Sequence, residues 1–219
     1  MREDRSRIVN RIRTAYLESA RSAAGLVAHP EISSHWEYPG ASQGMTVGAI
    51  AAHLVSSGIE ILIPYLEGES PPGTRVLEPS RYFSGQSIDL EHEGHQEVRK
   101  KAEVGARRGA ASLASDASAA VSGLTPRIAE QPEGRRIRVL GAFDMTLDGF
   151  LITRMVELLA HTDDLAASVG VATPDVPRDA VDAVVSCLTD VARRRHGDLA
   201  VLRALARHER STDGVFPVF

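Results

Sequence analysis

The sequence lacks the features that mark secreted, nucleic-acid-binding and membrane proteins. Its 219 residues include a single cysteine, Cys187, which excludes an intramolecular disulfide and fits a reducing compartment. The formal net charge is -4 and no clustered basic face stands out, so we expect no nucleic-acid partner. The first residues contain no uninterrupted apolar segment like that of a signal peptide, and no run is expected to span a membrane. These absences favour a cytoplasmic protein.

Strand-like patterns and internal repeats are also scarce, whereas apolar residues recur every three or four positions along most of the chain. This periodicity predicts an all-α protein. Thr46 is a candidate N-cap for the second helix, Thr146 or Asp148 for the fourth, and Gly170 can close the fourth. The expected helices lie within residues 3–28, 47–65, 89–123 and 147–169, followed by additional C-terminal helices at about 178–209.

Two long stretches rich in proline and glycine interrupt the helical pattern. The first, residues 67–86, is expected to begin where Pro64 breaks the second helix. It is too long for a tight turn, but it could cross the bundle and return the chain parallel to the preceding helix. The second, residues 125–141, contains a β-prone piece at 137–140 whose pairing the sequence does not decide. The chain length fits one domain over residues 1–219.

The fourth predicted helix carries four ionisable side chains in one row. Arg154, Glu157, His161 and Asp164 are three or four residues apart and therefore project from one face. A carboxylate and an imidazole four residues apart can converge on one cation. The simpler interpretation is an exposed Glu/His pair, with an ion pair from Arg154 to Glu157 that contributes only about 0.2–0.5 kcal/mol. Spacing alone favours this simpler interpretation.

A catalytic metal centre commonly uses three protein ligands, so a third donor must come from another helix. Of the eight histidines, only His53 and His161 combine a helical context with the edge of an apolar stripe. Bundles build metal sites from side chains on facing helices, so His53, Glu157 and His161 form a consistent ligand set. Asp164 could accept the imidazole N–H of His161 and orient it, or it could be a solvated helix carboxylate.

Two motifs resemble signatures of a known family. The sequence TVGAIAAHL at residues 46–54, preceded by Trp36, resembles the first signature of the DinB/YfiT-like proteins of the mycothiol-dependent maleylpyruvate isomerase type. The sequence RMVELLAHTDDL at residues 154–165 resembles the second signature of the same family. The resemblance extends over residues 5–209 and includes the tail at 202–207.

The resemblance implies a DinB-like four-helix bundle with up-down-down-up topology and a long crossover between the second and third helices. It also implies a divalent metal, most often zinc, with nickel, iron and manganese as alternatives, held by His53, Glu157 and His161. Related members use a low-molecular-weight thiol, such as mycothiol, as cosubstrate for isomerisation or S-transfer. The isomerase carries a further C-terminal domain related to sterol-carrier proteins that these 219 residues do not include, so the substrate stays open.

We therefore predict a metal-dependent S-transferase or isomerase that presents a thiolate to an electrophilic small molecule. Arg154 and Asp164 are the predicted catalytic residues, although Arg154 could instead serve packing or pair with Glu157. A metal-assisted hydrolase is less favoured, because Glu157 as a ligand leaves no separate general base. A non-catalytic bundle that binds a small molecule or a partner is the third alternative. Cys187 is expected to be a small buried packing residue, and a homodimer is a further expectation.

Overall fold

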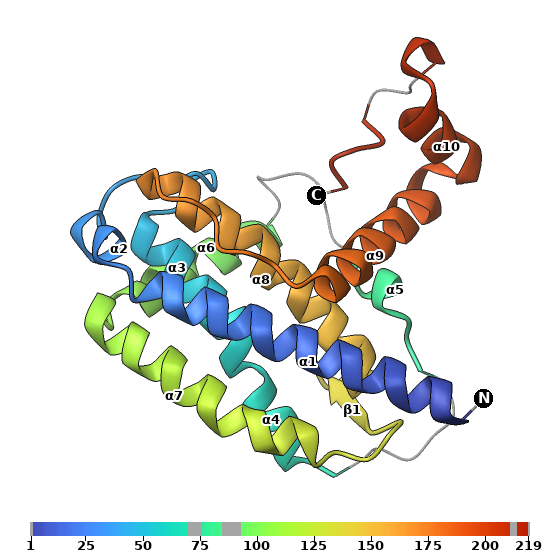
Figure 1. The fold of residues 1–219 in the computed structure, drawn as a ribbon. Helices are drawn as coiled ribbons and strands as arrows, with labels where there is room; N and C mark the ends of the chain where they lie inside the picture. Colours follow the sequence, from blue (N-terminus) through green and yellow to red (C-terminus); the bar gives the residue numbers. More distant parts are fainter. Residues whose placement is uncertain (1, 70–75, 85–92, 211–213, 219) are drawn as a thin grey trace.

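Four helical segments of the computed structural model pack side by side (Figure 1). The first is α1 (Arg2–Val27), which packs against α7 (Ala110–Ala129) and α8 (Leu147–Val169). The second segment begins with α3 (Val47–Val55) and packs against the same two helices from the other side. The all-α prediction is confirmed. The structure describes residues 2–69, 76–84, 93–210 and 214–218.

The direction of the four segments confirms the predicted topology. In Figure 1, α1 and α8 run in one direction, whereas the α3 segment and α7 run in the opposite direction, which is the up-down-down-up order. Two successive segments can be parallel only if a long connection returns the chain. That connection contains α5 (Pro79–Ser84), which packs against α8, and α6 (Glu93–Ala106), which packs along α3.

The single helix predicted over residues 89–123 is wrong, because the structure divides it into α6 and α7. Gly109 lies between them with a φ of +79°, a conformation that ends the regular helix and favours glycine. Of the two, only α7 is one of the four bundle helices. It continues past Pro126 to Ala129, because Leu124 and Ile128 on either side of the proline are buried in the core. The proposed start of the helix at residues 89–92 lies outside the described residues.

The second bundle segment is also less regular than predicted. α3 passes into a π-helical turn, η1 (Ser56–Glu60), and continues as α4 (Leu62–Glu67). Pro64 therefore lies inside a helix, and the prediction that it breaks the helix is wrong. A proline has no N–H to donate to the carbonyl four residues earlier, and the π turn shifts the hydrogen-bond register in this region.

The helical stretch Val47–Glu67 bears on the expectation that no run spans a membrane. By length and composition alone it is apolar enough to cross a membrane, with a mean hydropathy of 1.6 in its most apolar window. In the structure 61% of that window is buried inside the bundle, which is what a core helix requires.

Threonine caps begin the two helices on which the site is built. The hydroxyl Oγ1 of Thr46 accepts a hydrogen bond from the amide of Ala49, and Oγ1 of Thr146 accepts one from Gly149, so both predicted caps are present. Of the two candidates at the start of α8, Thr146 is the cap and Asp148 is not. Gly170 closes α8 in the left-handed conformation, as predicted.

A short hairpin leads directly into α8. The strands β1 (Arg136–Val139) and β2 (Phe143–Thr146) pair antiparallel, so the partner of the β-prone piece at 137–140 lies within the six residues that follow it. Ile137, Val139 and Met145 are buried against the bundle, which fixes the hairpin to the core.

The remaining helices lie at the ends of the bundle. Pro30 follows the end of α1 and opens the short helix α2 (Pro30–Ser34). The additional C-terminal helices are α9 (Arg178–His196), which packs against α1, α5 and α8, and α10 (Asp198–Ala206), followed by the turn η2 (His208–Arg210).

Candidate metal centre

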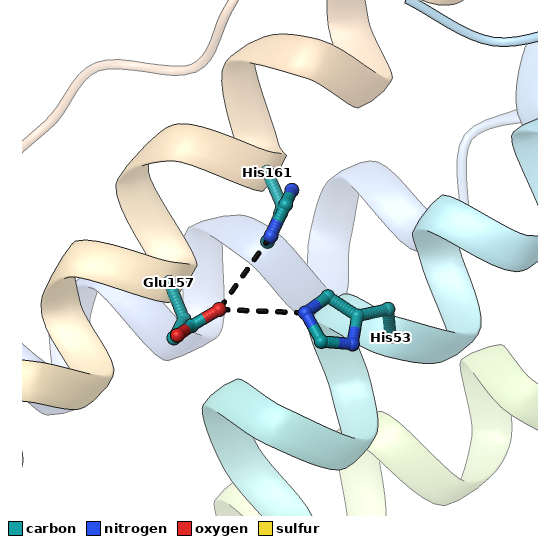
Figure 2. Close-up of side chains that lie close together, drawn as sticks. All are labelled: His53, Glu157 and His161. Carbon is teal, nitrogen blue, oxygen red and sulfur yellow. Dashed lines mark ion pairs between the residues drawn. The ribbon is translucent and has the colours of Figure 1, made fainter. Parts of the chain in front are cut away.

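Two helices bring His53, Glu157 and His161 together (Figure 2). His53 projects from α3 toward α8, and its Nε2 atom lies 3.4 Å from Oε2 of Glu157. The Nε2 atom of His161, one turn further along α8, lies 3.5 Å from the same oxygen. The two imidazole rings meet edge to face with centroids 4.7 Å apart. The structure therefore assembles the three side chains that the sequence predicted as a set.

The donor set fits a divalent cation. One ligand atom from each of the three residues lies within 4.8 Å of the other two, and two imidazole nitrogens with one carboxylate oxygen are donors that zinc and neighbouring transition metals accept. The three side chains are only 16–19% exposed, so the group is neither an exposed Glu/His pair nor sealed from solvent. An ion could enter and still meet a further ligand from outside.

The electrostatics keep Glu157 ionised beside a protonated His161, whose proton a bound cation would displace. Burial alone would raise the pKa of Glu157, but hydrogen bonds from His161 and His53, together with the charge of Arg154, hold it well below its usual range. Burial would lower the pKa of His161, whereas its hydrogen bonds to Asp164 and Glu157 raise it to about 9. Glu157 is therefore a carboxylate at neutral pH, as a metal ligand must be.

Asp164 lies beside His161 on the side away from the triad. Its Oδ2 atom is 3.0 Å from Nδ1 of His161, so the carboxylate accepts the N–H of that ring nitrogen. This hydrogen bond leaves Nε2 of His161 facing Glu157. Carboxylates commonly orient metal-ligating histidines in this way, so the contact fits the predicted orienting role.

Arg154 lies beneath the triad and is 2% exposed. Its Nη1 atom donates to the carbonyl of Ser57 at 2.8 Å, and its Nη2 atom lies 4.0 Å from Oε1 of Glu157. The guanidinium also lies over the rings of Phe150 and Tyr82. The predicted contact between Arg154 and a substrate stays a prediction, and the burial of the side chain favours an effect through Glu157.

The two helices approach closely beside the triad, a contact that the sequence pattern did not predict. A Cβ atom on Gly58 would lie 2.7 Å from Cδ2 of Leu158, so any larger residue in the η1 turn would require the buried Leu158 side chain to shift. The hydroxyl of Tyr16 donates to the carbonyl of Gly58 and fixes the same turn. Gly58 within the apolar stripe of residues 47–65 was the available signal, since a glycine inside a helix often marks a close contact.

Cys187 lies on α9, which carries none of the three triad residues, and it is 6% exposed. Burial and the charge of Asp190 raise the pKa of its thiol to about 11. A higher pKa leaves less of the thiol as thiolate, and the greater nucleophilicity of that more basic thiolate offsets only part of the loss in reaction rate. We expect iodoacetamide at pH 8 to label Cys187 in the folded protein at least about tenfold more slowly than in the urea-unfolded chain, as followed by mass spectrometry. Equal rates would show that Cys187 is an accessible thiol and a candidate nucleophile.

Residues 16–166 match the family described as the mycothiol maleylpyruvate isomerase N-terminal domain. The matched region includes the motif at 46–54 and all three residues of the triad. It ends before the tail at 202–207, so the resemblance of that tail stays a prediction. The chain has no significant match among curated proteins or among solved structures.

Proposed function

The chain belongs to the mycothiol maleylpyruvate isomerase N-terminal domain family, which is DinB-like, and we propose that it is a metal-dependent enzyme that uses a low-molecular-weight thiol. The thiol would be of the mycothiol type, and the reaction would be S-transfer to, or isomerisation of, an electrophilic small molecule. The observation that carries this proposal is the convergence of His53, Glu157 and His161 from two helices within the matched region.

In this proposal, His53, Glu157 and His161 hold the metal, with zinc as our choice and nickel, iron or manganese as alternatives. The bound metal would supply stabilisation of the thiolate form of a sulfur in its open position. The protein's side chains set the conditions for this chemistry. Glu157 stays ionised, Asp164 holds the N–H of His161 on the far side of the ring, and the packed helices exclude bulk water from the inner side of the triad.

The second candidate function, metal-assisted hydrolysis, is less well supported. A hydrolase of this kind needs a base that can take a proton from water. Glu157 lies between the two histidines, and Asp164 accepts the N–H of His161, so neither carboxylate is available without breaking a contact. A non-catalytic bundle that binds a ligand is the third candidate, since a ligand set alone does not show turnover.

The partners would be a thiol and an electrophile, with neither nucleic acid nor membrane, and the protein would act in the cytoplasm. A single domain over residues 1–219 and a homodimer stay proposals.

The experiment uses untagged, zinc-loaded protein with mycothiol and two electrophiles, maleylpyruvate for isomerisation and a bromobimane for S-conjugation. We expect at least one electrophile to be consumed faster than in the protein-free reaction with the thiol, only when metal is present, and we expect this acceleration to be lost on chelation and in His53→Ala. Replacing zinc with cobalt should give a sulfur-to-metal absorption band on adding the thiol. Ester cleavage that needs no thiol would support the hydrolase instead, and saturable binding without turnover would support the binding protein.

A further inference from the structure

We propose that Arg154 is a positioning residue that turns one carboxylate oxygen of Glu157 toward the histidines and holds the other away from them. The two oxygens of Glu157 have different neighbours. Oε2 lies 3.4 Å and 3.5 Å from the Nε2 atoms of His53 and His161. Oε1 lies 4.0 Å from Nη2 of Arg154. With Arg154 in this place, Glu157 offers a single oxygen to a cation, and the outer side of the centre stays open for another ligand.

The guanidinium of Arg154 is held on several sides and has little freedom to swing away. Its Nη1 atom donates to the carbonyl of Ser57 at 2.8 Å, and its Nε atom donates to Oγ1 of Thr153 at 3.1 Å. Its carbon Cζ lies 4.8 Å from the ring centroid of Phe150 and 5.3 Å from that of Tyr82. Because the guanidinium is planar, fixing it in this way also fixes the direction of the N–H groups on Nη2, which lies toward Oε1 of Glu157.

The remaining nitrogen, Nη2, is buried and has no hydrogen-bond partner among the residues that the structure describes. A buried donor is normally satisfied, so an unsatisfied one at a candidate site needs an explanation. The charged group that faces it is Oε1 of Glu157, at a distance too long for a hydrogen bond. A shift of about 1 Å would bring the two atoms to the length of a charge-assisted hydrogen bond. We infer that this bond forms when Oε2 engages a cation, so that both oxygens of Glu157 are then satisfied.

Arg154 also connects the two halves of the centre. Ser57, whose carbonyl it binds, lies in the η1 turn that directly continues the helix of His53. Glu157 lies one turn further along the helix of Arg154 itself. One buried side chain therefore contacts both the carboxylate ligand and the helix that presents the third ligand, and its removal should disturb the geometry of the whole triad.

This inference rests on the proposed metal centre, and it is tested on metal binding itself. We would measure zinc affinity by chelator competition, and the visible spectrum of the cobalt form, for wild type, Arg154→Lys and Arg154→Met. Arg13→Lys is the matched control, because Arg13 is also a buried arginine that binds main-chain carbonyls, but it contacts the end of α7 and the start of α8. We expect both Arg154 variants to weaken zinc binding by about 10–100-fold, the range for groups that orient a metal ligand, and to change the cobalt spectrum.

The control separates positioning from a general loss of stability. Arg13→Lys should lower the midpoint of thermal unfolding, yet leave zinc affinity within about twofold of wild type and the cobalt spectrum unchanged. If Arg154→Met does not fold, Arg154→Lys alone tests the inference, because lysine keeps the charge and most of the volume but lacks the planar guanidinium. Wild-type affinity and spectrum in the Arg154 variants would overturn the inference and leave the metal centre intact. A wild-type protein that binds neither zinc nor cobalt would overturn the proposed function instead.

Discussion

Replacing His161 with alanine should weaken zinc binding by more than about 100-fold, because even residues that only orient a metal ligand contribute 10–100-fold. His53→Ala should have an effect of the same size, since both imidazoles face the same oxygen of Glu157 at nearly equal distances. Glu157→Gln keeps the shape of the side chain but removes the charge, so it should also bind zinc poorly. Metal content by mass spectrometry and affinity by chelator competition, on protein without a histidine tag, give the measurement.

The matched control is His196→Ala, which removes an exposed histidine at the end of α9. Zinc content should fall from near one per chain to the background level in the triad variants and stay at the wild-type level in the control. Circular dichroism should show that all variants remain helical, because the triad residues lie at the edge of the core. Zinc retained in His53→Ala and His161→Ala, or lost equally in His196→Ala, would contradict the assignment of the ligands.

Most of the site could be predicted because its parts follow from local rules. The spacing of Glu157 and His161 places them on one helix face, and Thr146 and Gly170 define where that helix begins and ends. His53 could be added because its helix begins at Thr46, which fixes the side on which the histidine emerges relative to the apolar stripe. Local capping and periodicity therefore predicted the two elements that carry the triad.

The depth of each side chain in the row could not be read from spacing. Arg154 and Asp164 share a helix face with the triad, yet Arg154 is buried against the rings of Phe150 and Tyr82 while Asp164 is partly exposed. Tyr82 comes from α5, a short helix in the irregular crossover that the sequence pattern did not predict. The environment of Arg154 therefore depends on a contact between segments about 70 residues apart, and periodicity carries no information about such a contact.

The breaks inside helices were missed for a related reason. Apolar and small residues keep the helical period through Gly109, so the pattern continues where the backbone does not. Arg108 then pairs with both Glu60 and Asp116, which ties this turn to the second segment and to α7. Conversely, the helical path continues past Pro64 and Pro126. Pro64 lies in the first turn of α4, where no hydrogen bond within that helix is lost, whereas at Pro126 burial of its neighbours outweighs the lost hydrogen bond.

Arg13→Met should lower the free energy of unfolding by about 3–5 kcal/mol, the range for removing one partner of a buried ion pair. The Nε atom of Arg13 donates to Oδ1 of Asp148 at 2.8 Å, and both side chains are largely buried. Its terminal nitrogens donate to the carbonyls of Ile128, Gln131 and Pro132. These carbonyls lie at and just beyond the end of α7, where a helix runs short of internal donors, although those of Ile128 and Pro132 also accept main-chain N–H groups. Methionine keeps much of the volume but leaves a carboxylate and three carbonyls without this donor.

Urea unfolding of the metal-free protein measures this effect, with Arg11→Met as the control. Arg11 is an exposed arginine two residues earlier on α1, so its replacement should change the stability by no more than about 0.5 kcal/mol. The comparison separates the network of Arg13 from the loss of any positive charge on this helix. Because Arg13 joins α1 to the end of α7 and the start of α8, its loss should loosen the contacts among three of the four bundle segments at once. A loss of less than about 1 kcal/mol in Arg13→Met would mean that water replaces the guanidinium at these carbonyls, and that apolar packing alone holds the bundle at this end.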